Sequence, residues 1–98
     1  MAVKPVRWSA EKSLSLKAER GVSFEEVLSA ISQGGLLSVM DHPNRARYRH
    51  QKILVVRILD YAYLVPYVEN DEEIFLKSII PSRKATRDFL SGGKQDER

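Results

Sequence analysis

The sequence predicts a single α+β domain: two N-terminal helices and a C-terminal helix packed on one face of a curved, mainly antiparallel sheet of four to five strands. Helix-capping patterns fill the first third of the chain, and strand-like runs follow from residue 36 to residue 80. A last capping pattern stands at residue 82. A chain of 98 residues builds one modest core, so we expect one domain over 1–98, ordered over about 6–91, with a frayed tail at 92–98.

The first expected elements are a short extended segment at residues 6–8 and a helix directly after it. Ser9 suits the helix N-cap because its side-chain oxygen accepts a free backbone N–H. Gly21 ends the helix, since glycine takes the left-handed conformation without strain. Three residues fall four apart and so share one face of this helix: Ala10, Leu14 and Ala18.

A second helix is expected immediately after Gly21. Ser23 and Glu26 form a capping box, in which each side chain accepts the backbone N–H of the other residue. Gly34-Gly35 ends the element. Its apolar residues repeat at helical spacing: Phe24, Val27, Leu28 and Ile31.

From residue 36 the pattern is that of strands. Residues 36–40 predict a strand that His42-Pro43-Asn44 breaks. Residues 52–58 are a β-branched run, typical of a strand covered on both faces. Leu59-Asp60 predicts a tight reversal into a further strand at 61–68.

Pro66 constrains that further strand, because proline cannot donate to a ladder, and we expect it at a sheet edge or in a bulge. Residues 70–72 predict a turn, and residues 73–80 predict the last strand. Pro81-Ser82 begins the C-terminal helix. Two apolar residues four apart are expected on its inner side: Ala85 and Phe89.

The composition excludes several classes of protein. The chain has no cysteine, which excludes a disulfide framework, thiolate metal sites and a cysteine nucleophile. No run approaches the ~18 apolar residues of a membrane-spanning helix, and the first residues lack the apolar core of a secretory signal. We therefore expect a cytoplasmic protein with no membrane partner. The net charge of +3 is too small to indicate nucleic acid by itself.

The distribution of charge is more informative, because no acid occurs between Asp41 and Asp60. Arginine suits phosphate through its planar pair of donors, and a neighbouring tyrosine can stack on a base. A solvated loop is the alternative interpretation. The basic and aromatic residues of this stretch are His42, Arg45, Arg47, Tyr48, Arg49, His50, Lys52 and Arg57.

The two histidines are the default candidates for proton transfer, since only their side chains have an ordinary pKa near neutrality. His42 precedes a proline in a turn and His50 leads into a strand, so either could equally be a structural hydrogen-bonding residue. No metal-ligand spacing, serine-nucleophile elbow or glycine-rich phosphate loop occurs, and we expect no metal and no cofactor.

Polar residues also occur in the later strands and the last helix. Tyr63 and Tyr67 are four apart and share a sheet face, and Lys77 is expected to face solvent. Three cations oppose the dipole at the start of the last helix, which suggests that an anion is held there: Arg83, Lys84 and Arg87.

Four segments carry a resemblance to a known family. They are Val6-Arg7-Trp8 with Lys12, then Arg20-Gly21-Val22-Ser23-Phe24-Glu25-Glu26, then Arg47-Tyr48, then Ile80-Pro81-Ser82-Arg83-Lys84-Ala85-Thr86. In this order they resemble the BrnT-like toxins, small ribonucleases of bacterial type II toxin–antitoxin systems with a fold related to RelE. The resemblance spans roughly residues 6–90. Glu19-Arg20 stands where the family has Lys-His, and Ser9 stands where the family has Asp.

The resemblance implies a RelE-like fold, RNA cleavage without metal, and a cognate antitoxin of ribbon-helix-helix or similar DNA-binding type. Operator DNA would be contacted only through that antitoxin. By position, the resemblance assigns function to four residues: Lys12, Arg47, Tyr48 and Arg83.

The expected reaction is attack of an RNA 2′-hydroxyl on the adjacent phosphate. Arg47 and Arg83 would stabilise the phosphorane, and a histidine would transfer protons. The catalytic candidates are Arg47, Tyr48, Arg83, His42 and His50. The candidates for RNA binding are Lys12, Arg45, Arg49, Tyr63, Tyr67, Lys77, Lys84 and Arg87. Two alternatives stay open: a non-catalytic co-repressor module that binds antitoxin or DNA, and a RelE- or ParE-fold toxin that acts on a protein such as gyrase.

Overall fold

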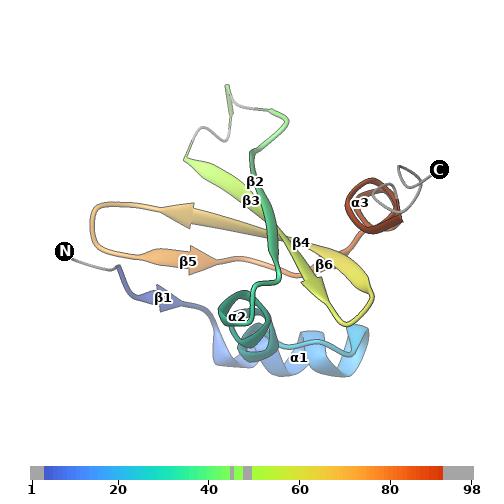
Figure 1. Cartoon of the computed structure of the whole chain (residues 1–98). Helices are drawn as coiled ribbons and strands as arrows, with labels where there is room; N and C mark the ends of the chain where they lie inside the picture. Colours follow the sequence, from blue (N-terminus) through green and yellow to red (C-terminus); the bar gives the residue numbers. More distant parts are fainter. Residues whose placement is uncertain (1–3, 45, 48–49, 92–98) are drawn as a thin grey trace.

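The computed structural model describes residues 4–44, 46–47 and 50–91, and it has the expected α+β class (Figure 1). The helical elements are α1 (Ala10–Arg20), α2 (Phe24–Ser32), α3 (Arg83–Thr86) and a π-helical turn η1 (Arg87–Ser91). The strands are β1 (Val6–Arg7), β2 (Leu36–Asp41), β3 (Gln51–Ile58), β4 (Tyr61–Glu69), β5 (Ile74–Leu76) and β6 (Ile80–Pro81).

One mixed sheet runs in the order β1-β5-β4-β3-β2, and β6 also pairs with β4. Among the described strands, only β1 and β5 pair in parallel; the pairs among β2 to β6 are antiparallel, as the sequence predicts. The sheet has six strands because the single last strand expected at 73–80 is interrupted into β5 and β6.

The predicted helix caps are confirmed. The Ser9 side chain accepts the backbone N–H of Lys12, and Gly21 ends α1 with a φ of 77°. The Ser23 hydroxyl accepts the backbone N–H of Glu26, while the Glu26 carboxylate accepts the backbone N–H of Ser23. These caps make the reversal between α1 and α2 short, so both helices reach the same face of the sheet (Figure 1).

The buried side of α1 differs from the face that the four-residue spacing indicates. Leu14 is 75% exposed and its neighbours on that face, Ala10 and Ala18, are also exposed, whereas Ser13 and Leu16 are buried. The Ser13 hydroxyl accepts the backbone N–H of Phe24 at 3.0 Å and donates to the Glu25 carboxylate at 2.7 Å. This buried serine ties α1 to the start of α2 and so fixes which side of α1 faces inward.

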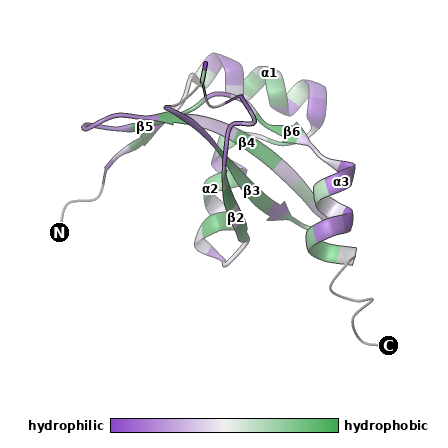
Figure 2. Ribbon diagram, turned by 90° about the horizontal axis from the view of Figure 1, so that it is seen from above, coloured by the Kyte–Doolittle hydropathy of each residue, from purple (hydrophilic) through white to green (hydrophobic). Residues whose placement is uncertain are grey.

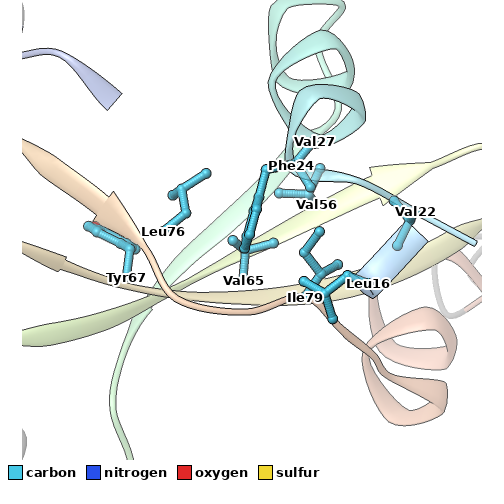
Figure 3. Packing of buried hydrophobic residues seen from close by; sticks show 9 residues of the cluster. All are labelled: Leu16, Val22, Phe24, Val27, Val56, Val65, Tyr67, Leu76 and Ile79. Atoms are coloured by element: carbon cyan, nitrogen blue, oxygen red, sulfur yellow. The ribbon is translucent and has the colours of Figure 1, made fainter. Parts of the chain in front are cut away.

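The long hairpin of β3 and β4 forms the centre of the sheet. It closes through Leu59 and Asp60 as predicted, with Leu59 at a φ of 58°. The prediction that β3 is covered on both faces is confirmed. Val56 packs in the main core with α1 and α2, whereas Val55 packs in a second cluster with Ala85 of α3. Figure 3 shows the main core, with Phe24 between the helices and the sheet.

The last helix therefore lies on the opposite face of the sheet from α1 and α2, and the expectation that all helices share one face is wrong. Successive residues of a strand point to opposite faces, so Val55 and Val56 report the two sides directly. Figure 1 shows the same arrangement, with α3 on the other side of the strands from α1 and α2.

Pro66 is not at a sheet edge, because β4 lies between β3 and β5. Its carbonyl accepts the backbone N–H of Lys77 at 2.8 Å, on the side where the neighbouring strand is interrupted between β5 and β6. The missing N–H of proline thus faces a break in the partner strand. The register shifts by one residue across this break, because two residues of β4 (65–66) face three residues of its neighbour (77–79). The expected edge position is therefore wrong, whereas the alternative, a bulge, is present in the partner strand.

The inner residue of the last helical segment also differs from the expectation. Ala85 is buried as predicted, but Phe89 is exposed and Leu90 packs on the second cluster. The cause is η1, because a π-helical turn brings residues five apart, rather than four apart, to the same side.

Replacing Ser13 with alanine should destabilise the fold by about 1–3 kcal/mol, because it leaves the buried Phe24 N–H without an acceptor. The free energy of unfolding is measured by urea titration. The matched control is Ser15→Ala, two residues along on the exposed side of α1, for which we expect a change within about 0.5 kcal/mol. Equal effects of the two substitutions would contradict the tie between α1 and α2.

The stability should also fall in acid. The hydrogen bond from Lys17 at 2.6 Å, with that from the Ser23 backbone, holds the pKa of Glu26 below its usual value of 4.5. A lowered pKa in the folded state adds stability above the unfolded-state value, and this is lost as the pH falls through the folded-state value. We expect Glu26→Gln and Lys17→Met each to reduce the fall in unfolding free energy on acidification below about pH 4.5. If the unfolding free energy of both variants fell with pH in parallel with that of the unsubstituted chain, this role of the Lys17–Glu26 pair would be contradicted.

Candidate functional site

The connection between β2 and β3 holds the first group of candidate residues, of which His42, Arg47 and His50 are described. The backbone N–H of Asn44 donates to Nδ1 of His42 at 3.0 Å, and the Asn44 side chain accepts the backbone N–H of Arg47 at 3.2 Å. This hydrogen bond makes His42 part of the turn. The remaining candidates of the stretch lie outside the described residues: Arg45, Tyr48 and Arg49.

His50 occupies a different setting at the base of the same connection. It lines a hollow with Lys4, Lys52, Glu69 and Asp71, together with Val68 and Asn70. Lys4 and Glu69 are joined at 2.6 Å, and this hydrogen bond, with the charge of Lys4, holds the pKa of Glu69 below its usual range. His50 is exposed and lies beside the cations Lys4 and Lys52 and the carboxylates Glu69 and Asp71.

The start of α3 forms the second group. Ser82 caps the helix by accepting the backbone N–H of Ala85 at 3.0 Å. The Thr86 hydroxyl accepts the backbone N–H of Ala62 at 2.9 Å and donates to the Ser82 carbonyl at 2.8 Å. These bonds hold α3 against β4. In the Ser-Arg-Lys-Ala-Thr segment, the serine, alanine and threonine therefore serve the fold.

The charged residues of α3 are exposed. Asp88 pairs with Lys84 at 3.0 Å and with Arg87 at 3.6 Å, and these contacts, led by the Lys84 hydrogen bond, hold the pKa of Asp88 below its usual range. Arg83 makes no ion pair or side-chain hydrogen bond within the described residues. With only four residues before η1, α3 has a weak dipole, which reduces the cost of three cations at its start.

The two tyrosines share a sheet face, as predicted, but they differ in exposure. Tyr67 belongs to the main core and is 7% exposed, and its burial raises the pKa of its hydroxyl. The ring of Tyr67, a candidate for RNA binding, is therefore enclosed in the core and leaves little surface for a ligand. Tyr63 is half-buried, lies edge-on to Tyr61 at 5.7 Å, and remains accessible in part.

Two lysines complete the set of candidates. Lys12 is exposed on α1, and Lys77 is exposed in the segment between β5 and β6, as expected for a solvent-facing position. Neither lysine lines the hollow that contains His50.

The structure separates the α3 group from the His50 hollow. The Ser82 N–H donates to the Ala62 carbonyl, whereas Gln51, next to His50, pairs with Val68. Residues 62 and 68 of β4 are about 20 Å apart at ~3.3 Å per residue. Arg83 and His50 therefore lie too far apart to contact one phosphate in this structure.

Three charged residues of the hollow are absent from the candidates that the sequence predicts, namely Lys4, Glu69 and Asp71. Lys4 precedes the first strand, and its neighbours in space become evident only from the pairing of β1 with β5 and of β5 with β4. The expected hairpin between β4 and β5 is the sequence signal that could have placed Glu69 near His50.

Within the described ranges, no group of three or more His, Cys, Asp or Glu side chains is placed to hold a metal ion. The helices in this part of the chain are also too short or too polar to cross a bilayer. Comparison of the chain with protein-family models, with curated proteins and with solved structures gave no match.

Proposed function

We propose that this chain is the toxin of a bacterial type II toxin–antitoxin pair, with a RelE-like fold, and that it cleaves RNA without a metal ion. The observation that carries the proposal is Arg83. It lies in a segment of the BrnT-like pattern whose serine, alanine and threonine hold the fold, and its own exposed guanidinium has no partner among the described residues. A guanidinium left exposed in this way is suited to a phosphate oxygen pair.

In this proposal the chemistry occurs near His50. The RNA 2′-oxygen attacks the adjacent phosphorus and gives up its proton to a base, while the P–O5′ bond breaks and the 5′-oxygen receives a proton. The products are a 2′,3′-cyclic phosphate and a free 5′-hydroxyl. We assign proton transfer to His50, because His42 uses Nδ1 in the turn. Arg47 and the lysines beside His50 stabilise the phosphorane charge.

Arg83 and Lys84 then bind the RNA at a flanking phosphate rather than at the scissile one, since α3 begins about 20 Å from the base of the β2–β3 connection. A cytoplasmic location and neutralisation by a DNA-binding antitoxin follow from the same toxin class.

Purified chain is incubated with labelled single-stranded RNA in the presence of EDTA, and the product ends are identified. We expect His50→Gln to lower the rate of cleavage about 100-fold or more, the scale of general acid–base catalysis. Arg83→Ala should raise the KM by about tenfold to a hundredfold with a smaller change in kcat, because it removes a charge-assisted contact.

Two matched controls accompany these variants. Arg7→Ala removes an exposed arginine of the edge strand β1, whose side chain pairs with Glu73, and it should leave cleavage unchanged. His42→Gln should retain most of the activity. Loss of cleavage in His42→Gln but not in His50→Gln would overturn the assignment of proton transfer.

Absence of cleavage by folded protein would overturn the ribonuclease proposal itself. Growth arrest of bacteria that express the chain, with intact RNA, would instead indicate a protein target such as gyrase. No arrest at all would favour the co-repressor module.

A further inference from the structure

The edge strand β2 has features of an interaction surface. It is the terminal strand on its side of the sheet and pairs only with β3 in the part of the chain that the structure describes. A strand in this position presents a row of unpaired N–H and C=O groups on its outer side. Edge strands are normally protected by lysine, proline or a covering element, whereas β2, with the sequence LLSVMD, contains neither lysine nor proline.

The side chains of β2 add to this. Three of its apolar residues are among the exposed large hydrophobic residues, namely Leu36 at 41%, Val39 at 49% and Met40 at 37%. Most of β2 accordingly has the colour of hydrophobic residues in Figure 2. Unpaired backbone groups and exposed apolar side chains therefore occur on the same strand. An added strand would accept and donate the backbone hydrogen bonds and would bury the apolar side chains.

The charges decide which strand fits. The only charged residue of β2 is Asp41, at its last position, and it leads into the basic connection that contains Arg47. Parallel pairing of two copies would bring the two carboxylates and the two basic connections together. Antiparallel pairing places the two carboxylates, and the two basic connections, at opposite ends of the new ladder. The neutral residues of the two strands then face each other, and like charges are kept apart.

The backbone alternation sets the register. The His42 N–H donates to the Gln51 carbonyl, so His42 faces β3, and by alternation the N–H and C=O of Val39 face outward. A two-fold axis at Val39 lets the two copies of this residue exchange both backbone hydrogen bonds. Met40 of each copy then lies opposite Ser38 of the other.

We propose that a second copy of this chain pairs with β2 in antiparallel orientation, with Val39 on the two-fold axis, so that the two sheets form one continuous sheet. This dimer does not depend on the proposed function. It leaves α3 and the His50 hollow of each copy at separate places, because neither borders the outer side of β2.

The absence of cysteine from the chain allows a direct test. In an antiparallel hydrogen-bonded pair the two Cα atoms are about 5.5 Å apart, within the ~4.4–6.8 Å that a disulfide spans. We expect Val39→Cys to form a covalent dimer under mild oxidation at least tenfold faster than Leu14→Cys, whose site on α1 is even more exposed. Equal rates would indicate random collision and would overturn the proposal.

Sedimentation of the unsubstituted chain over a range of concentrations provides the second measurement. We expect a reversible dimer that Val39→Lys converts to a monomer, since two like charges then stand opposite each other across the axis. Val39 is half-exposed, so the monomer should keep its fold, which circular dichroism checks. A chain that stays monomeric at all concentrations, or a dimer that Val39→Lys leaves intact, would overturn the proposal.

Discussion

The arrangement of this molecule depends on one constraint, the lack of an N–H on Pro66 in the central strand. Because β4 cannot donate there, its neighbour breaks between β5 and β6, opposite the proline. The break lets Ile79 turn into the main core, where its carbonyl accepts a hydrogen bond from the Arg20 guanidinium at the end of α1. It also restarts pairing at residue 80, which leads directly to Ser82 and sends α3 to the other face of the sheet.

The family-like segments gain a physical explanation from these contacts. Gly21, Ser23 and Glu26 form the reversal between α1 and α2, and Ser82 and Thr86 fix α3 to β4. Such residues describe how the chain folds, and their order along the sequence would be retained by any protein with the same reversal and the same cap. Arg83 differs from these residues, because its exposed side chain makes no contact that stabilises the fold within the described residues. Arg83 therefore supports the proposed function more directly than the longer glycine-containing segment does.

The local features could be predicted from the sequence. The features that depend on contacts between distant segments could be predicted only in part. The caps and the turn at Leu59-Asp60 are determined by neighbouring residues. The coverage of β3 comes from distant helices, but the continuous β-branched run of the strand already indicates it. The π-helical turn is not determined by neighbouring residues, because Leu90 replaces Phe89 on the inner side only when the helix widens to fit the second cluster. The burial of Tyr67 and the place of Lys4 beside His50 depend on strand order, which periodicity does not report.

The length of β4 has a consequence for any reaction at this surface. One end of β4 borders the hollow that contains His50, whereas the other end borders the exposed cations of α3. A rigid central strand keeps these groups about 20 Å apart, so one phosphate cannot satisfy both. A ligand that uses both must be extended and must carry several negative charges, and this requirement favours a polynucleotide over a small phosphorylated molecule. A single-stranded chain meets it most easily, because its backbone can follow the curve of the sheet between the two ends.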